Sequence, residues 1–470
     1  MNVRDVRVAH LVGVGGINMA AVAKLLLAAG VRVSGSDIAE NDETRALSQR
    51  GATIALGHAA ENVPADADVV IHTSAAPESN PEREEARRRG VPEMTNFAFL
   101  GQWFEDAKQI LVTGTHGKST TTAMLGLMLD RAKLDPTIVV GTKVPGLADG
   151  NLRIGSSDVL LIEGDEYERH FLEFHPYGVI VNNIELDHTD VYPTLEDFVG
   201  AFRALLDRVR EGGIIVANVG DANVAALLAS MREELSARRI RIVRFNGKAK
   251  GDWRFSFQRD GAMFGFALEL DGVSLAYSLK VPGAFNALNA AGASLMALEL
   301  GAQVPDIAET LASFPGVWRR FESLARREDV QWFSDFGHHP TAVASTLAGA
   351  REAFPGSRIL LCFQPHHRNR TKHLFDDFVR CFTGADVLVF CEIYDVAGRE
   401  QGEDADVSSR QLAERVLRYD AERGASRPVV YAENPNVALE RIDSFVQPGD
   451  VVIVMGAGDI DAAAREYLKR

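Results

Sequence analysis

Cysteine is scarce in this sequence. The 470 residues include only three cysteines, Cys362, Cys381 and Cys391, and none of them forms a C-x-x-C pair. An odd number of widely spaced cysteines argues against a disulfide framework and is typical of a reducing compartment. We therefore expect three buried, unpaired thiols and a cytoplasmic protein.

Long apolar runs are missing as well. No stretch of 18 apolar residues occurs, so the sequence predicts no membrane-spanning helix. The first residues, MNVRDVRVAHLVGVGG, lack both the apolar core and the small-residue cleavage site of a secretory signal peptide. We therefore expect no membrane partner.

Positive charge is in deficit. The chain has 50 Lys and Arg against 65 Asp and Glu, a formal net charge of −15, which argues against a broad nucleic-acid-binding surface. An acidic protein that handles phosphates has to concentrate its positive charge in loops and at helix N-termini. We expect no nucleic-acid partner, and the sequence leaves open whether the protein is a monomer or a homodimer.

Length and composition indicate several globular domains. Hydrophobic residues make up 46% and charged residues 24% of the chain, as in ordinary soluble proteins. At roughly 150 residues per domain, the length predicts about three domains. We place these domains at residues 1–108, 109–313 and 314–470.

Strands and helices alternate along each of these segments, which indicates α/β folds built on parallel sheets. Residues 6–16 read as a strand that ends in a glycine turn, and residues 17–30 read as a helix. Residues 240–280 alternate apolar and polar side chains, as antiparallel strands at the edge of the central domain would. We expect Rossmann-like N- and C-terminal domains, and between them a P-loop ATPase-type parallel sheet with an antiparallel edge.

Residues 112–122, VTGTHGKSTTT, differ from a phosphate-binding loop at one position. The pattern G-x-x-x-x-G-K-[ST] ends in Gly117-Lys118-Ser119, but Val112 stands where the first glycine belongs. The stretch follows an apolar strand and opens a helix, where backbone N–H groups can hold a phosphate. Lys118 would reach the β- and γ-phosphates, and Ser119 would ligate Mg²⁺. This context favours a nucleotide site over a simple polar turn.

Acidic residues cluster at two predicted strand ends. Residues 162–170, IEGDEYERH, and 182–190, NNIELDHTD, each complete an apolar strand. Hard cations take carboxylate oxygens, and ligands of α/β sheets bind at the carboxyl ends of strands. The two stretches together favour a cation site over solvated loop charges. The candidates are Glu163, Asp165, Glu166, Glu168, Glu185, Asp187, His188 and Asp190.

Histidines gather in two later stretches. Residues 335–342, DFGHHPTA, and 364–371, QPHHRNRT, hold four of the twelve histidines and two arginines. A His-His pair is compatible with zinc, but no third ligand stands at metal spacing. Recognition of an anionic substrate is favoured, because arginine forks match carboxylates.

A glycine-rich turn follows the first predicted strand. In residues 12–18, VGVGGIN, the three glycines fit the start of a dinucleotide fingerprint, but Asn18 takes the place of the final glycine. The turn is either a phosphate cradle or an ordinary tight turn. Residues 35–37, GSD, end the next strand, where contacts to a ribose or base are common.

Taken in order, the motifs GTHGKST, EGDE, NNIELDH, FNALNA, RRFE, DFGHHPT and GAGDID resemble those of the Mur ligase family. These ATP-dependent amide ligases build the peptide stem of peptidoglycan, and the resemblance covers nearly the whole chain. It implies three domains, which hold a UDP-sugar, ATP with Mg²⁺, and the incoming amino acid.

The resemblance also implies individual roles. The residues implied to bind ATP are Gly114, Thr115, His116, Gly117, Lys118, Ser119, Thr120, Asn286, Asn289, Arg320 and Asp335. The implied magnesium ligands are Ser119, Glu163 and His188. The residues implied to bind the UDP-sugar or acceptor are Gly13, Gly15, Gly16, Asp37, Ser74, His339 and His367. The implied catalytic residues are Lys118, His188, His338, His366 and Arg370.

The motifs HLVGVGG, SGSD, TSAAPESNPE and QPHHRNRTKHLFDDF are most similar to those of members that attach L-alanine to UDP-N-acetylmuramate through an acyl phosphate. The stretches EGDEYE and NNIELDH instead resemble members that recycle murein peptides and attach a whole tripeptide to the same sugar. Two other classes of protein fit the sequence less well. A degenerate nucleotide-binding regulator would need a damaged phosphate loop, and an NAD(P)-dependent oxidoreductase would leave GTHGKST unexplained.

Several positions depart from the family pattern. Asn18 interrupts the glycine turn, and Phe285 stands where a histidine is common. His367 replaces an arginine at the acceptor end of the site, while Arg368 is added beside it. Arg203 lies where several relatives carry a carbamylated lysine, a role that arginine does not perform.

Overall fold

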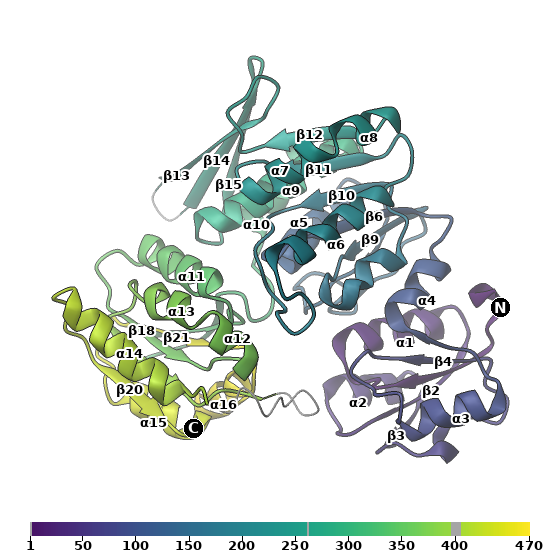
Figure 1. Cartoon of the computed structure of the whole chain (residues 1–470), viewed down its shortest axis with the longest axis horizontal. Coiled ribbons are helices and arrows are strands. Elements are labelled where there is room, and N and C mark those ends of the chain that lie inside the picture. The colour runs from purple at the N-terminus through teal and green to yellow at the C-terminus, as the bar shows by residue number, and fades with distance from the viewer. Residues whose placement is uncertain (1, 261–262, 396–405) are drawn as a thin grey trace.

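The computed structural model describes residues 2–260, 263–395 and 406–470, which form three α/β units, each built around its own main sheet (Figure 1). In Figure 1 the purple N-terminal unit and the green-to-yellow C-terminal unit lie on either side below the teal central unit. The predicted three-part α/β architecture is confirmed. Among the described helices, none is long and apolar enough to cross a membrane.

The N-terminal unit is a five-stranded parallel sheet in the order β3-β2-β1-β4-β5. Its strands are β1 (Val8–Val12), β2 (Arg32–Asp37), β3 (Thr53–Leu56), β4 (Val69–His72) and β5 (Glu93–Thr95). Its helices are η1 (Val3–Asp5), α1 (Ile17–Ala28), α2 (Asp42–Gln49), η2 (Ala60–Asn62), α3 (Pro81–Arg89) and α4 (Asn96–Trp103). The predicted strand–glycine turn–helix is β1 followed by α1.

The central unit has a seven-stranded sheet in the order β12-β11-β10-β6-β9-β7-β8. Its strands are β6 (Lys108–Thr113), β7 (Thr137–Val139), β8 (Leu152–Arg153), β9 (Val159–Glu163), β10 (Gly178–Val181), β11 (Ile214–Asn218) and β12 (Arg241–Phe245). Its helices are α5 (Lys118–Arg131), η3 (Tyr167–Glu173), α6 (Leu195–Asp207), α7 (Ala222–Ser230), α8 (Arg232–Ala237), α9 (Ala284–Glu299) and α10 (Val304–Ser313).

The predicted antiparallel edge is present, but residues 240–280 do not form it. The edge strand β8 pairs antiparallel with β7, whereas β12 pairs parallel with β11. A separate antiparallel sheet contains β13 (Arg254–Asp260), β14 (Met263–Leu270) and β15 (Val273–Leu279). Its apolar face, which includes Phe264 and Phe266, is buried in the same cluster as side chains of α9 and α10. Alternation predicted the antiparallel pairing correctly, but it does not specify which sheet a strand joins.

The C-terminal unit is a six-stranded sheet in the order β16-β17-β21-β18-β19-β20, parallel except for the edge strand β16. Its strands are β16 (Glu322–Arg327), β17 (Val330–Asp335), β18 (Ile359–Phe363), β19 (Val387–Cys391), β20 (Val429–Ala432) and β21 (Val451–Met455). Its helices are α11 (Pro340–Ala353), α12 (Arg368–His373), α13 (Phe375–Cys381), α14 (Ser409–Glu422), α15 (Pro435–Asp443) and α16 (Ile460–Tyr467). As predicted, Cys362, Cys381 and Cys391 are buried and unpaired, and burial raises the pKa of each thiol.

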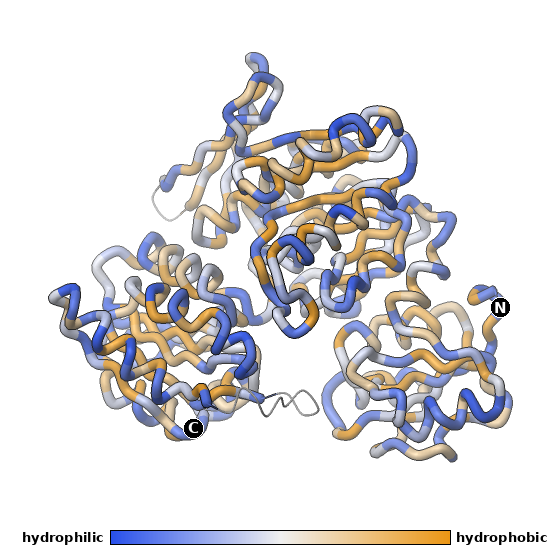
Figure 2. The backbone as a smooth tube through the Cα atoms, viewed as in Figure 1, coloured by the Kyte–Doolittle hydropathy of each residue, from blue (hydrophilic) through white to orange (hydrophobic). Residues whose placement is uncertain are grey.

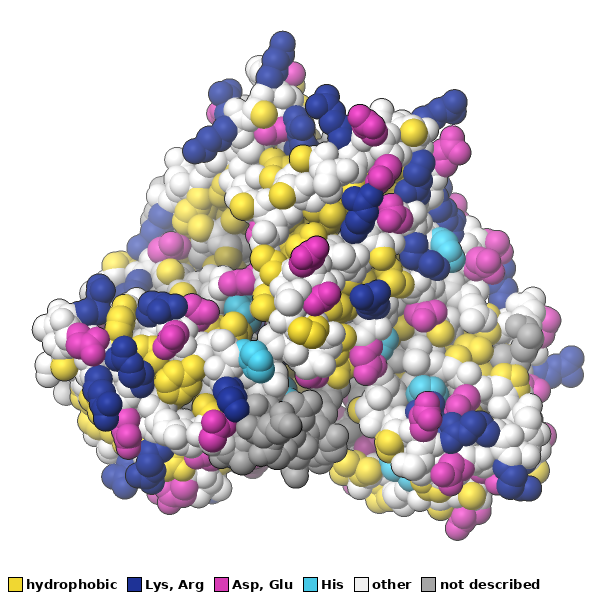
Figure 3. Space-filling model, in the orientation of Figure 1, with side chains coloured by type: hydrophobic (Ala, Val, Ile, Leu, Met, Phe, Trp, Pro, Cys, Tyr) yellow, Lys and Arg dark blue, Asp and Glu magenta, His cyan; other side chains and the backbone are white. Residues whose placement is uncertain are grey.

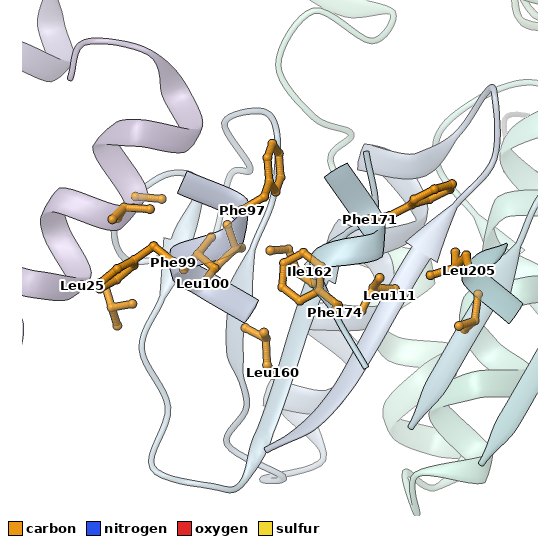
Figure 4. Close-up of a cluster of buried hydrophobic side chains, with 14 of the residues drawn as sticks. Leu25, Phe97, Phe99, Leu100, Leu111, Leu160, Ile162, Phe171, Phe174 and Leu205 are labelled. Atoms are coloured by element: carbon orange, nitrogen blue, oxygen red, sulfur yellow. The ribbon is translucent and has the colours of Figure 1, made fainter. Parts of the chain in front are cut away.

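Hydrophobic residues follow the inner strands of all three units, and hydrophilic residues occupy the outer turns (Figure 2). One buried cluster continues from the N-terminal unit into the central unit. Figure 4 shows Phe99 and Leu100 of α4 beside Leu160 and Ile162 of β9 and Phe174 after η3. Complete burial of each such side chain contributes about 1.5–3 kcal/mol. The first two units are therefore joined by a shared core as well as by the chain.

Candidate functional site

A cavity of about 710 Å³ lies between the central and C-terminal units. Its walls come from the phosphate loop, the ends of β9 and β10, the start of α9, and the β17–α11 connection. The stretches that the sequence predicted to carry chemistry therefore meet at one place. In Figure 3 histidine side chains are visible where the left and upper lobes of the molecule adjoin.

The predicted phosphate loop connects β6 to α5. Gly117 lies directly before α5 in the left-handed conformation, with φ of 82°. A Cβ atom there would lie 2.1 Å from Asn289 Oδ1, so both conformation and space require glycine. The first N–H groups of α5 are directed toward the cavity end of the helix, where they can bind an anion. The local structure therefore fits a phosphate site although Val112 replaces the first glycine.

Lys118, the first residue of α5, is held by oxygen atoms. Its Nζ donates hydrogen bonds to the Gly114 carbonyl at 2.8 Å and to Glu166 Oε1 at 2.7 Å. Burial by itself would lower the pKa of Lys118, but the carboxylates of Glu166, Glu163 and Asp165 outweigh burial and raise it. Lys118 is therefore a charged ammonium group in an acidic surrounding.

Glu163 lies beside the phosphate loop. Its Oε1 accepts a hydrogen bond from Ser119 Oγ at 2.9 Å, and its Oε2 accepts one from Gly141 N at 2.8 Å. Burial raises the pKa of Glu163. A hydroxyl and a carboxylate side by side at a phosphate loop are oxygen ligands suited to Mg²⁺. The side chains of Ser119 and Glu163 therefore fit a cation.

His188 has φ of 52° in the loop after β10. Its Nε2 lies 3.6 Å from Glu166 Oε1. Burial would lower the pKa of His188, but the carboxylates of Asp187 and Glu166 outweigh burial and raise it. The carboxylate beside the imidazole Nε2 is thus Glu166, whereas the sequence grouped His188 with Glu163.

Helix α12 of the C-terminal unit touches the same loop. Arg370 Nε donates a hydrogen bond to Asp187 Oδ1 at 2.8 Å, and Thr189 Oγ1 donates one to Asn369 Oδ1 at 2.6 Å. Burial opposes ionisation of Asp187, but the Arg370 guanidinium outweighs it and holds the pKa of that carboxyl well below its usual range. This buried ion pair joins two predicted site stretches that are 183 residues apart.

A second polar cluster joins the two units through Glu185. Its Oε2 lies 2.9 Å from His116 Nε2 and 3.8 Å from His339 Nδ1, and its Oε1 accepts a hydrogen bond from Thr341 Oγ1 at 2.6 Å. One ligand atom from each of His116, Glu185 and His339 lies within 4.8 Å of the others. This group contains only His339 of the two predicted His-His pairs, so neither pair gains a third ligand in it. His339 Nδ1 also accepts a hydrogen bond from Thr341 N at 3.3 Å.

His338, half-buried, also lines the cavity. Its Nδ1 is 3.0 Å from the Phe336 carbonyl oxygen, so Nδ1 carries the proton and Nε2 is left as the acceptor. Burial and the nearby Arg370 guanidinium hold the pKa of His338 well below its usual range. The imidazole is therefore neutral. His366 lies 5.8 Å from His338 between ring centroids, and His367 has φ of 73° directly before α12.

The residues implied to bind the nucleoside also line the cavity. They are Asn286, Asn289, Arg320 and Asp335. Asp335 accepts hydrogen bonds from Phe321 N at 2.9 Å and Gly337 N at 2.7 Å, and burial raises its pKa. The guanidinium of Arg320 lies 4.9 Å from the centroid of the Phe336 ring.

The glycine turn of the N-terminal unit lies at the start of α1. Gly13 has φ of 79°, and Gly15 N donates a hydrogen bond to Asp37 Oδ2 at 2.8 Å. The Asp37 carboxylate thus binds the backbone of the turn. Ser74 lies half-buried in the turn after the neighbouring strand β4. A smaller cavity of about 170 Å³ is lined by both Asn18, at the start of α1, and Glu163.

Several residues that line the cavity were not predicted individually from the sequence. Asn183 Oδ1 accepts a hydrogen bond from His116 N at 2.8 Å and so supports the phosphate loop. Asn218 and Asn223 line the cavity from β11 and α7. The asparagines at the ends of the predicted strands, in NNIE and ANVGD, were the signal in the sequence that could have identified them. Arg203 lies on α6, 38% exposed, and pairs with Glu234, so it contributes nothing to the cavity.

Comparison with known proteins covers nearly the whole chain. Three family models match it: "Mur ligase family, catalytic domain" at residues 8–108, "Mur ligase middle domain" at 112–297 and "Mur ligase, glutamate ligase domain" at 319–458. A UDP-N-acetylmuramate–L-alanine ligase of Trichlorobacter lovleyi is 37% identical over 98% of both chains. The enzyme of the same name from Mycobacterium tuberculosis is 37% identical over 99% of this chain and 94% of its own.

Two solved structures also match the chain over nearly its whole length. The crystal structure of UDP-N-acetylmuramate-alanine ligase MurC from Thermotoga maritima superposes with a TM-score of 0.80 and 29% identity over 98% of both chains. A murein peptide ligase from Psychrobacter arcticus has a TM-score of 0.69 and 22% identity over 98% of both chains, which shows a shared fold only.

Proposed function

Because this chain belongs to the Mur ligase family, we propose that it joins L-alanine to UDP-N-acetylmuramate with ATP, in the synthesis of peptidoglycan precursors. One observation carries the proposal: the full-length relatives that are 35–37% identical are UDP-N-acetylmuramate–L-alanine ligases. The substrates are then a UDP-sugar and a small amino acid, and the reaction takes place in the cytoplasm.

The chemistry requires activation of a carboxylate, which is too poor an electrophile for direct attack by an amine. Attack of the sugar carboxylate on the γ-phosphorus of ATP breaks the bond to ADP and forms an acyl phosphate. The amine then attacks the acyl carbon, and phosphate leaves. Positioning both partners supplies much of the rate, and exclusion of water protects the intermediate.

The two cavities suit this sequence of steps. ATP would lie in the 710 Å³ cavity, with its phosphates at the N-terminus of α5 and its base near Asn286 and Asn289. The UDP-sugar would lie on the glycine turn of the N-terminal unit. Its carboxylate would reach the phosphates through the smaller cavity, because Asn18 of the N-terminal unit and Glu163 beside the phosphate loop both line it.

The side chains that would hold Mg²⁺ are Ser119, Glu163 and His188. Bound Mg²⁺ supplies charge neutralisation at the transferring phosphoryl group. Lys118 would exchange its contact with Glu166 for phosphate oxygens and stabilise the same charge. Each of these groups lines the same cavity.

The C-terminal unit would present the acceptor. His338 and His339 line the cavity. His366, His367 and Arg370 lie at the start of α12, behind the residues that line it, and Arg370 Nη1 is 3.3 Å from His366 Nδ1. We propose that the neutral His338 takes the proton that the attacking ammonium has to lose, because its Nε2 lone pair is free to accept it. Arg370 would orient the amino-acid carboxylate.

Phosphate release from ATP with Mg²⁺ and UDP-N-acetylmuramate tests the proposal. We expect turnover with L-alanine and much less with L-serine, glycine or the L-Ala-γ-D-Glu-meso-diaminopimelate tripeptide. Turnover with the tripeptide alone would reassign the protein to murein peptide recycling. Lys118→Ala is the matched inactive control, because it removes the phosphate-loop ammonium without changing the acceptor side.

A further inference from the structure

The segment that follows β7, residues 141–143, reaches from the two cavities to the N-terminal unit. Its first residue, Gly141, lines both cavities, and the Gly141 N–H donates a hydrogen bond to Glu163 Oε2 at 2.8 Å. Two residues later, Lys143 Nζ lies 3.2 Å from Glu43 Oε1 of α2. The segment therefore joins a residue that lines both cavities to a charged group of the N-terminal unit.

Glu43 binds two ammonium groups. Its side chain is 13% exposed, and its Oε2 lies 2.8 Å from Nζ of Lys24, a buried residue of α1. Lys24 Nζ also donates a hydrogen bond to the carbonyl oxygen of Asp149 in the central unit, at 3.2 Å. Burial would raise the pKa of Glu43, but the ammonium groups of Lys24 and Lys143 outweigh burial and lower it. An ionised carboxylate of the N-terminal unit is therefore held by one lysine of its own unit and one of the central unit.

Helix α2 carries this attachment to the glycine turn. The helix begins after Asn41, whose side chain forms a capping box with Thr44. Asn41 Nδ2 also donates a hydrogen bond to the Gly15 carbonyl at 3.2 Å. Glu43 lies in the first turn of the same helix, so a displacement of Glu43 also displaces the group that binds the glycine turn. The shared apolar cluster joins the two units at α4, and the pair of Glu43 and Lys143 adds a second attachment beside the turn.

Trp318 holds the backbone of residues 142 and 143. It lies in the connection between α10 and β16, which leads into the C-terminal unit. Trp318 N donates a hydrogen bond to the Lys143 carbonyl at 2.9 Å, and Thr142 Oγ1 donates one to the Trp318 carbonyl at 3.2 Å. Lys143 Nζ also lies 5.7 Å from the centroid of the Trp318 ring, a distance at which a cation and an aromatic ring attract each other. The Lys143 ammonium is therefore held within reach of Glu43.

We propose that Lys143 is a positioning residue for the ligation. Through Glu43 and α2 it fixes where the glycine turn lies relative to the phosphate loop, and so the distance between the sugar carboxylate and the γ-phosphate. Lys143 is not among the described residues that line either cavity, so it acts through Glu43 and not on a reacting atom. The inference rests on the proposed function in placing a UDP-sugar at the turn and ATP at the loop. The identity of the acceptor amino acid does not enter it.

Lys143→Met tests the inference, because it removes the ammonium but keeps a long side chain. We expect kcat for phosphate release with UDP-N-acetylmuramate and L-alanine to fall at least about tenfold, since a misplacement of about 1 Å can cost roughly 10²-fold in rate. The KM for ATP should change less than about twofold, because the phosphate loop is intact. Lys143→Arg should restore most of the kcat, because a guanidinium also pairs with a carboxylate.

A second variant identifies the partner of Lys143. Glu43→Gln should lower kcat by a similar factor, and the double variant should be no slower than either single variant, because both changes break the same contact. Arg45→Met on α2 is the matched control, because Arg45 pairs with Glu40 and Asp42 within its own unit. Its kcat should equal that of the unmodified protein.

A distance measurement tests the position of the N-terminal unit directly. Nitroxide labels on Glu84→Cys of α3 and Glu233→Cys of α8 would report its separation from the central unit, because both positions are exposed and the three natural cysteines are buried. We expect one narrow distribution of distances, by electron–electron double resonance, for the labelled protein and for its Lys143→Arg variant. Lys143→Met should broaden or shift this distribution.

Two results would overturn the inference. One is a kcat of Lys143→Met within about twofold of the unmodified protein. The other is a distance distribution of Lys143→Met identical to that of the labelled protein without this change. The distance measurement needs no turnover, so failure of this inference and failure to ligate L-alanine are distinguishable.

Discussion

At the scale of single residues, the phosphate loop depends on a glycine that the sequence pattern identified correctly. Gly117 combines φ of 82° with a Cβ position 2.1 Å from Asn289 Oδ1. Gly212 has a similar φ of 72° but open space around it. The same substitution at the two positions therefore separates the cost of backbone strain from the cost of a steric collision.

We predict that Gly117→Ala raises the KM for ATP at least about tenfold and lowers stability by about 2 kcal/mol, because Asn289 and the start of α5 have to move. Gly212→Ala should cost only about 1 kcal/mol of backbone strain and leave the KM unchanged. Steady-state kinetics and thermal denaturation measure both effects. An equal KM in the two variants would contradict the assigned role of Gly117.

A second residue-scale feature is Glu82, which is completely buried in the N-terminal unit. Burial would raise its pKa, but hydrogen bonds from His10, Ser36 and Asn62 outweigh burial and lower the pKa to about 2. The folded pKa therefore lies below the unfolded value of 4.5. Ionised Glu82 stabilises the fold above about pH 4.5, and this contribution is lost as the pH falls from 4.5 toward 2.

We predict that Glu82→Gln lowers the stability at pH 7 by about 3 kcal/mol and that this difference shrinks progressively below pH 4.5. The exposed Glu84→Gln on the same helix is the control and should change stability by less than about 0.5 kcal/mol. Thermal denaturation between pH 7 and pH 3 provides the measurement. A difference that stays constant with pH would show that packing, not ionisation, is responsible.

At the scale of elements, α4 is the contact between the first two units. A Cβ at Gly101 of α4 would lie 2.1 Å from the carbonyl oxygen of Glu173, at the end of η3. Glycine is unfavourable inside a helix, so its presence here reflects close approach of two backbones. Gly200 of α6 has nothing within 4 Å of its Cβ position.

We therefore predict opposite signs for the same substitution. Gly101→Ala should destabilise the protein by about 1–3 kcal/mol, because α4 has to move away from η3. Gly200→Ala should stabilise it by about 0.5–1 kcal/mol, because only the helix propensity changes. Chemical denaturation of the two variants checks the prediction, and stabilisation by Gly101→Ala would show that α4 and η3 do not pack closely in solution.

At the scale of the whole molecule, the two outer units contact the central unit differently. Among the described residues, the contacts of the C-terminal unit beside the cavity include Arg370 with Asp187, Thr189 with Asn369, and Thr341 with Glu185. By contrast, the N-terminal unit shares an apolar cluster with the central unit. The contacts that the C-terminal unit makes beside the cavity are thus polar.

We predict that ATP analogue and UDP-sugar together compact the molecule, and that Arg370→Ala opens it in their absence. Loss of the guanidinium leaves Asp187 buried and unpaired, at a cost of about 3 kcal/mol that opening relieves by hydration. Small-angle X-ray scattering would report an increased radius of gyration. Arg368→Ala on the same helix is the control, because Arg368 pairs with Asp395 within its own unit. Identical curves for all samples would argue against domain closure.

The sequence by itself determined the three α/β units, the phosphate loop and many of the groups that line the cavity. The alternating pattern of strands, the 3.6-residue pattern of helices, glycine turns and charged strand ends are local properties of the chain. The sequence alone therefore places GTHGKST between a strand and a helix, and EGDE and NNIELDH at the ends of strands. Tertiary structure alone decided that β12 is parallel and β13–β15 form their own sheet, because sheet membership depends on long-range pairing. It alone placed His188 beside Glu166 and Arg370 beside Asp187, because such contacts join residues that only folding brings together.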